Sequence, residues 1–261
     1  MNGVNKTLYI PLYGKAYVSK RGLFLRDEMA ERIWSAEGFK LRGKSASKWL
    51  AFYMGIRAAV FDEWLRSQLA AVPNAVVLHI GCGLDSRVVR VGTKGHKWYD
   101  VDFPQVIGER KRYFSDDGDY RMISADVRDS RWLEQIAEGG AAIVVMEGVS
   151  MYLRPEQLRL LTRDLSGRFD RVRCLMDCYT ELAGKLSRYK NPINDVGMTQ
   201  VYGLDDPASM DADGFRFLRE QEMTPARFME ELGGAEKVIF EKMYAGGFSK
   251  KLYRLYEFRK D

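Results

Sequence analysis

The sequence predicts a single α/β domain with a mostly parallel, Rossmann-like sheet. Three observations lead to this prediction. Short apolar runs alternate with helical patterns between residues 75 and 178, which is typical of βαβ units. The first run leads directly into a Gly-x-Gly turn, Gly81 to Gly83. The next run ends in an acid, Asp102, about 20 residues further on, as in nucleoside-binding folds.

The N-terminal part, residues 1–73, is expected to be a helical cap. Residues 1–24 predict an irregular arm that contains Lys15, because Pro11 interrupts their best apolar run. Residues 26–34 predict a helix with Asp27 near its start, and residues 49–71 predict a longer helix that ends before Pro73.

Residues 74–179 are expected to form the cofactor-binding core. The predicted strands cover residues 75–80, 97–101, 121–124, 142–146 and 172–178. The predicted helices cover residues 106–114, 132–137 and 155–169. Strands and helices that alternate in this way predict a parallel sheet with helices on its faces.

The C-terminal third departs from this rhythm. Residues 180–222 are irregular and rich in Gly and Pro, which predicts a lid or substrate-binding insertion. Residues 237–244 and 251–259 are strand-like runs joined by a Gly-Gly turn. We therefore expect residues 223–261 to form an antiparallel hairpin that completes a seven-stranded sheet.

Composition excludes several classes of protein. The 261 residues are 46% hydrophobic and 30% charged, which suits one large core. The net charge of +5 is spread among interleaved acids and bases, so we expect no nucleic-acid surface. The first 24 residues hold no signal-peptide core, and the longest apolar stretch, residues 141–146, is too short to span a bilayer. These features predict a cytoplasmic protein that does not bind membranes.

The cysteines and histidines predict neither a disulfide nor a metal site. Cys174 and Cys178 lie four residues apart in a predicted strand, which separates them by about 13 Å. The third cysteine, Cys82, lies in the glycine turn, and only two histidines, His79 and His96, accompany them. His79 is expected to be a core histidine that makes its hydrogen bonds within the sheet. No Cys or His spacing typical of zinc is present.

The glycine turn predicts a nucleoside cofactor without a pyrophosphate. Asp102 can accept hydrogen bonds from both hydroxyls of a ribose. A dinucleotide fingerprint has a third glycine where this chain has Ser86, and Asp85 places a negative charge where a pyrophosphate would lie. S-adenosylmethionine has no phosphate and tolerates such an acid, so NAD(P) is disfavoured.

Six segments resemble the leucine carboxyl methyltransferase family, and most of all its bacterial branch of tetracenomycin-type polyketide O-methyltransferases. They are LHIGCGLDSR at residues 78–87, WYDVDFPQVI at 98–107, SADVRD at 124–129, EGVSMYL at 147–153, PLYGKA at 11–16 and RAAVFD at 57–62. The branch commonly has Arg in place of Lys15 and Thr in place of Ser86, and residues 180–222 match it poorly. The resemblance implies a class I methyltransferase fold with S-adenosylmethionine as cofactor.

The resemblance also implies roles for individual residues. Lys15 and Arg57 would hold the methionine carboxylate of the cofactor, with Gly81 beneath the methionine portion. Glu147 would meet the ammonium group, and Asp102 the ribose. The remaining two positions, Asp126 and the backbone of Val127, would face the adenine.

Structural alternatives exist for four of these side chains. Lys15 could be an exposed arm residue, and Arg57 could pair with Asp62 on its own helix. Asp126 could only cap the following helix. Glu147 follows an apolar strand, where a carboxylate is costly unless it is paired.

The leading functional hypothesis is O-methylation of a small molecule, with a carboxylate as the acceptor. A carboxylate is already ionised at neutral pH and needs no general base, and this chain has few candidates for one. Tyr152 is a candidate acceptor-pocket residue, and no catalytic residue is assigned with it. Two alternatives remain open: methylation of a protein C-terminus, and a non-catalytic sensor of the cofactor.

Overall fold

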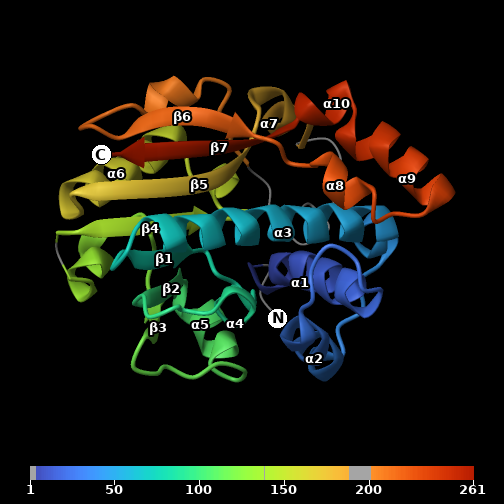
Figure 1. Cartoon of the computed structure of the whole chain (residues 1–261), viewed down its shortest axis with the longest axis horizontal. Coiled ribbons are helices and arrows are strands. Elements are labelled where there is room, and N and C mark those ends of the chain that lie inside the picture. Colours follow the sequence, from blue (N-terminus) through green and yellow to red (C-terminus); the bar gives the residue numbers. More distant parts are fainter. Residues whose placement is uncertain (1–3, 138, 188–200) are drawn as a thin grey trace.

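The computed structural model describes residues 4–137, 139–187 and 201–261, with the backbone alone at residues 4–7 and 248. Seven strands form one sheet in the order β3-β2-β1-β4-β5-β7-β6, which confirms the predicted fold class (Figure 1). The strands are β1 (Val76–Ile80), β2 (Trp98–Asp102), β3 (Tyr120–Ser124), β4 (Ala141–Met146), β5 (Arg171–Tyr179), β6 (Arg216–Gln221) and β7 (Tyr253–Lys260).

Strands β1 to β5 are parallel, and the chain reverses its direction of travel across the sheet between β1 and β4. A crevice at the carboxyl ends of the strands is expected at such a switch point. One face of the sheet packs against α3 (Lys48–Ala71), α4 (Arg87–Val91) and α5 (Pro104–Arg110). The other face packs against α6 (Pro155–Arg168) and the 3₁₀ helix η2 (Ser130–Gln135).

The antiparallel end of the sheet is present, but the prediction of its first strand was wrong. Strand β7 pairs with β5 on one side and with β6 on the other. β6 lies within the predicted lid, and its sequence, RFLREQ, has the charged character of an edge strand. The lid prediction also covered α7 (Glu181–Ser187) and the 3₁₀ helix η5 (Pro207–Met210), while its centre, residues 188–200, lies outside the described residues.

Residues 237–244 are helical, although a strand was predicted there. They belong to α9 (Gly234–Phe240) and to a π-helical turn, η6 (Glu241–Ala245), between α8 (Ala226–Met229) and α10 (Gly247–Lys250). Phe240 is fully buried and packs against Phe52 of α3 with a ring distance of 6.2 Å, whereas Val238 is half exposed. In a strand the two side chains would share a face, so tertiary packing overrides the local β propensity here.

The predicted irregular arm is a helix, α1 (Val4–Lys20), which packs against α3. Tyr9, Leu12 and Ala16 recur at helical spacing and are buried. Pro11 lies inside this helix, and a Cβ atom on Gly14 would lie 2.5 Å from Cβ of Met54. This glycine therefore lets α1 approach α3 closely.

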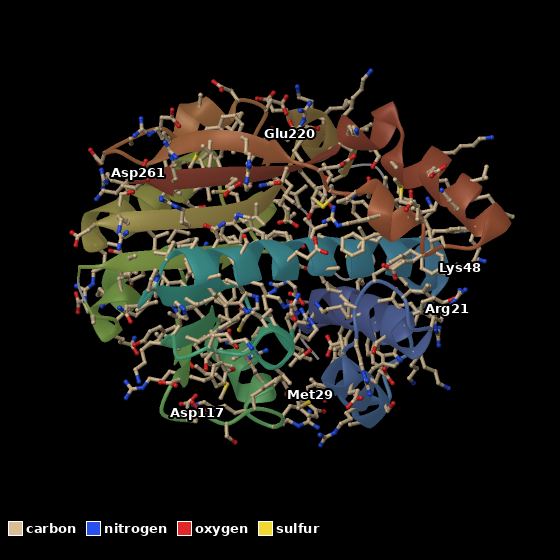
Figure 2. The ribbon with its side chains drawn as sticks, in the orientation of Figure 1. Arg21, Met29, Lys48, Asp117, Glu220 and Asp261 are labelled. Atoms are coloured by element: carbon tan, nitrogen blue, oxygen red, sulfur yellow. The ribbon has the colours of Figure 1, made fainter. Side chains whose placement is uncertain are left out.

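The cap also contains α2 (Glu28–Glu37), where Asp27 caps the N-terminus as predicted, and the short 3₁₀ helix η1 (Gly43–Ala46). Figure 1 shows α1 and α2 at the same end of the sheet as α8, α9 and α10, on either side of α3. Arg21 and Lys48, neighbours in Figure 2, both pair with Glu236 of α9 and so link the two helical groups. No described helix is both long and apolar enough to cross a membrane.

Substitution of Phe240 tests the helical assignment of residues 234–245. Phe240→Ala should lower the free energy of unfolding by about 3–5 kcal/mol, because it empties a packed core position. The matched variant Val238→Ala should change it by less than about 0.5 kcal/mol, because Val238 is half exposed on the same helix. Chemical denaturation measures both values, and similar losses for the two variants would instead indicate a strand.

Candidate active site

A cavity of about 1000 Å³ opens at the carboxyl ends of the parallel strands. It contains every site residue that the sequence predicts. The lining includes Lys15, Arg57, Gly81, Asp102, Asp126, Val127, Glu147 and Tyr152. These residues come from α1, α3 and the ends of successive strands, so the fold brings them together over the switch point between β1 and β4.

The glycine turn is required by its own packing as well as by room for a ligand. Gly81 has a φ of 67°, and a Cβ atom there would lie 2.2 Å from Cγ2 of Val149. Its amide donates to the carbonyl of Val101, with an N···O distance of 2.7 Å. The turn is thereby pressed between β2 and the loop that follows β4.

Asp102 is held with both oxygens at the cavity wall. Oδ2 accepts a hydrogen bond from the Gly83 amide at 2.8 Å, and Oδ1 accepts one from the Phe103 amide at 2.7 Å. Burial raises the pKa of the Asp102 carboxyl, although these two amides act in the opposite direction. Each oxygen keeps a further lone pair, which gives the carboxylate room for two more donors.

The next strand end carries Asp126, which is half-buried. Its carboxylate accepts bonds from the Arg128 side chain and, at 3.0 Å, from the Arg128 amide. The alternative that Asp126 caps the following helix was wrong, because Asp129 caps η2 by accepting from the Arg131 amide. Asp126 and Val127 instead border the cavity.

Glu147 lies between two arginines. Oε1 is 3.0 Å from Nη2 of Arg57, and Oε2 contacts Nη2 of Arg87. Burial alone would raise the pKa of the Glu147 carboxyl, but Arg57, Arg87 and Lys15 together lower it to about 2. The carboxylate is therefore paired and ionised at neutral pH.

Lys15 is 2% exposed and pairs with Asp85, with an Nζ···Oδ2 distance of 3.2 Å. The alternative that it is an exposed arm residue was wrong, because α1 holds it beneath the glycine turn. Charges of Arg90, Lys15 and Arg87 outweigh the effect of burial and hold the pKa of Asp85 well below its usual range.

Arg57 binds to groups from three strands. It donates to Glu147, to Asp177 at the end of β5 (3.1 Å) and to the Tyr253 hydroxyl on β7 (2.9 Å). The predicted alternative partner, Asp62, is wrong: Asp62 pairs with Arg87 and Arg90 at 2.8 and 2.7 Å.

These residues form one buried group, which we call the arginine–carboxylate cluster. Its members are Lys15, Asp27, Arg57, Asp62, Asp85, Arg87, Arg90, Glu147 and Asp177. Sequence reasoning missed Arg87, Arg90 and Asp177 as members. The three-residue spacing of the two arginines after the glycine turn was the available signal, since it places both on one helix face.

His79 is a core histidine, as predicted. Its Nδ1 lies 3.0 Å from Oδ1 of Asp100 and its Nε2 lies 3.1 Å from Nη1 of Arg87. Arginine can only donate, so Nε2 is the acceptor and the ring proton on Nδ1 goes to Asp100. The other histidine, His96, is bonded to the Ala75 carbonyl at the opposite end of β1.

Removal of one arginine should show how much stability is lost when the carboxylates of the cluster lose their cation. Arg90→Gln leaves Asp27, Asp62 and Asp85 without a shared cation, and should lower the free energy of unfolding by about 3–5 kcal/mol at pH 7. The pKa of Asp85 in the folded protein lies below its unfolded value of about 3.9. Its contribution to the free energy of unfolding is therefore present above that pH and is lost below it.

The difference between the wild-type protein and Arg90→Gln should therefore shrink as the pH falls below about 4. Denaturant unfolding at several pH values measures this difference. The control Arg131→Gln breaks an exposed pair with Asp129 and should leave stability unchanged. An equal difference at pH 3 and pH 7 would contradict the assignment of these charges.

Comparison with known proteins places the chain among methyltransferases. The model of the family described as leucine carboxyl methyltransferase matches residues 12–166. The tetracenomycin polyketide synthesis O-methyltransferase TcmP of Streptomyces glaucescens is 30% identical over 92% of this chain and 90% of its own length. The S-adenosyl-L-methionine-dependent methyltransferase dpfgK of Gibberella zeae is 24% identical over 81% of this chain and 78% of its own.

Among solved structures, the magnesium protoporphyrin IX methyltransferase of Synechocystis, with bound SAH, covers 95% of this chain and 97% of that one. Its TM-score is 0.53 and its sequence identity 15%, so this likeness concerns the fold.

Proposed function

Because the chain belongs to the leucine carboxyl methyltransferase family of S-adenosylmethionine-dependent enzymes, we propose that it methylates a carboxylate oxygen of a small molecule. The observation that carries this proposal is that neither histidine can serve as a base. Both nitrogens of His79 are bonded, and His96 lies at the far end of β1. An acceptor that is already ionised needs no base.

The residues along the strand ends fit the chemistry of the cofactor. We assign the adenine to Asp126 and the Val127 backbone, and the ribose to Asp102, whose two free lone pairs suit two hydroxyls. The methionine portion then lies over Gly81. The spatial order of the strands supports this placement. Asp126 follows β3, Asp102 ends β2 and Gly81 follows β1, and these three strands are neighbours in the sheet in that order.

The charged end of the cavity fits an amino-acid zwitterion. Glu147 would accept from the ammonium group, while Lys15 and Arg57 would bind the carboxylate. All three already lie close together, since both cations lower the pKa of Glu147. Part of the bonding between Arg57 and Glu147 would be exchanged for bonds to the ligand.

S-adenosylmethionine, when bound, supplies a methyl group on a positively charged sulfur. Asp102, Glu147, Lys15 and Arg57 would hold this cofactor, which would supply its methyl carbon to one oxygen of the acceptor and keep the electron pair of the carbon–sulfur bond on sulfur. No proton moves in this step. The chain's own contribution is to hold the reacting atoms in line and to exclude water from the acceptor oxygen.

Asp102 provides the test of cofactor placement. Asp102→Ala should raise the Kd for S-adenosylhomocysteine by a factor that corresponds to about 1–3 kcal/mol, because ribose hydroxyls lose their acceptor. Calorimetry measures the affinity, with Asp119→Ala as a control in the bend before β3, where the Asp119 carboxylate pairs with Lys97 at 2.9 Å. Unchanged affinity in Asp102→Ala would contradict the ribose assignment.

The pH dependence of turnover tests the carboxylate acceptor. A carboxylic acid has an unperturbed pKa of about 4, so the rate should be flat between about pH 6 and 9. Transfer from labelled cofactor measures the rate, and the product should be a methyl ester that mild alkali cleaves. A rate that rises about tenfold per pH unit, with an alkali-stable product, would indicate a hydroxyl acceptor instead.

A further inference from the structure

A buried acid that the proposed function does not use lies one strand away from the glycine turn. Asp100 of β2 is fully buried and stands directly opposite His79 of β1 in the strand register. Its Oδ1 lies 3.0 Å from Nδ1 of His79 and accepts from Nε1 of Trp98 at 2.8 Å. Burial alone would raise the pKa of Asp100, but Arg110 and the hydrogen bonds from His79 and Tyr120 lower it to about 2. The carboxylate is therefore ionised at neutral pH and can only accept hydrogen bonds.

An ionised acceptor at Nδ1 decides the tautomer of His79. Because the carboxylate of Asp100 cannot donate, Nδ1 carries the ring proton and Nε2 keeps its lone pair. Nη1 of Arg87 donates to this lone pair, with an N···N distance of 3.1 Å. The side chain of His79 is 2% exposed and borders the cavity. His79 thus passes the constraint from Asp100 to Arg87.

The guanidinium of Arg87 is fully buried and held along its edges. Nε donates to Oδ1 of Asp62 at 2.8 Å, and Nη1 donates to His79. A guanidinium is planar and rigid, so these two contacts set its plane and its rotation within that plane. The position of Nη2 follows from them, and it contacts Oε2 of Glu147. His79 is neutral in this tautomer, so it orients Arg87 without adding charge to the arginine–carboxylate cluster.

The two oxygens of Glu147 are not equivalent. Oε1 accepts from both Nε and Nη2 of Arg57, at 3.1 and 3.0 Å. Within the part of the chain that the structure describes, the hydrogen bond to Oε2 comes from Arg87 alone. An ionised carboxylate oxygen has two lone pairs, so Oε2 keeps one for a further donor. Glu147 borders the cavity, and Oε2 is therefore the oxygen that fits the ammonium group of a ligand.

We propose that His79 is a positioning residue for the cofactor. Together with Asp100 it orients Arg87, and Arg87 holds Oε2 of Glu147 where the ammonium group of S-adenosylmethionine binds. His79 acts on the cofactor through Arg87 and moves no proton in the reaction. This inference rests on the assignment of the ammonium group to Glu147 in the proposed function.

Two substitutions of His79 separate its two hydrogen bonds. His79→Gln places an amide oxygen at about the position of Nε2, so it keeps an acceptor for Arg87. The side chain in His79→Asn is one carbon shorter and ends near the position of Nδ1, so it reaches Asp100 but not Arg87. The probes are S-adenosylhomocysteine and its deaminated analogue, in which a hydrogen atom replaces the ammonium group. Calorimetry measures the Kd of both.

His79→Asn should weaken binding of S-adenosylhomocysteine roughly tenfold, the loss expected for a hydrogen bond to a charged group, and should change the Kd of the analogue less than about twofold. His79→Gln should bind both ligands as the wild-type protein does. The control His96→Gln alters the other histidine, at the opposite end of β1, and should also leave both affinities unchanged.

A purely structural role for His79 predicts different results. His79→Asn would then weaken both ligands equally, or His79→Gln would be as damaging as His79→Asn. Either outcome, or wild-type affinity for S-adenosylhomocysteine in His79→Asn, would overturn the inference and leave the proposed function intact. Equal affinity of the wild-type protein for the two ligands would overturn the assignment of the ammonium group to Glu147 as well.

The tautomer of His79 provides a test that needs no substitution at that position. The chain has two histidines, so untagged, ¹⁵N-labelled His96→Gln gives imidazole signals from His79 alone. Long-range ¹H–¹⁵N spectra should show a protonated Nδ1 and an unprotonated Nε2. A proton on Nε2 would overturn the inference, and this measurement decides it even where His79→Asn does not fold.

Discussion

Buried arginines that must be paired dictate how the helical cap sits on the sheet. Arg90 joins Asp27 at the start of α2, Asp62 in α3 and Asp85 in the glycine turn. An unpaired charge at this depth costs several kcal/mol, so the three segments are stable only when they converge on it. Arg87 extends the same constraint to Glu147 at the end of β4. The pairing of these charges therefore fixes how the segments are placed relative to one another.

Arg57 connects the two halves of the cavity. Its contacts with Glu147 belong to the charged half, while its contact with the Tyr253 hydroxyl belongs to the aromatic half. Strand β7 makes this connection possible. Antiparallel pairing aligns Tyr253 with Tyr179 at the carboxyl end of β5, beside Asp177. The last strand of the sheet thus completes the site as well as the core.

The local sequence pattern was sufficient to predict the structure where a single segment determines its own conformation. The Gly-x-Gly turn, the parallel strands and the side chains at their ends follow from short motifs, and Asp102 and Glu147 lie where those motifs predict. Contacts between segments far apart in the sequence determine the structure of the other segments. Residues 237–244 are helical because Phe240 packs against Phe52, almost two hundred residues earlier. Tyr253 and Asp177 joined the site through strand pairing, which the pattern of neither segment encodes.

The charge balance of the cluster bears on which ligand it accepts. The cluster has five acids, Asp27, Asp62, Asp85, Glu147 and Asp177, against four bases, Lys15, Arg57, Arg87 and Arg90. Burial raises the pKa of Asp177 despite its contact with Arg57, and the neighbouring Glu147 carboxylate acts in the same direction. S-adenosylmethionine carries one more positive than negative charge, whereas its demethylated product is neutral. A cation entering the cavity offsets the excess acid, so this balance agrees with the proposed placement of the ammonium beside Glu147 and favours the methyl donor over its product.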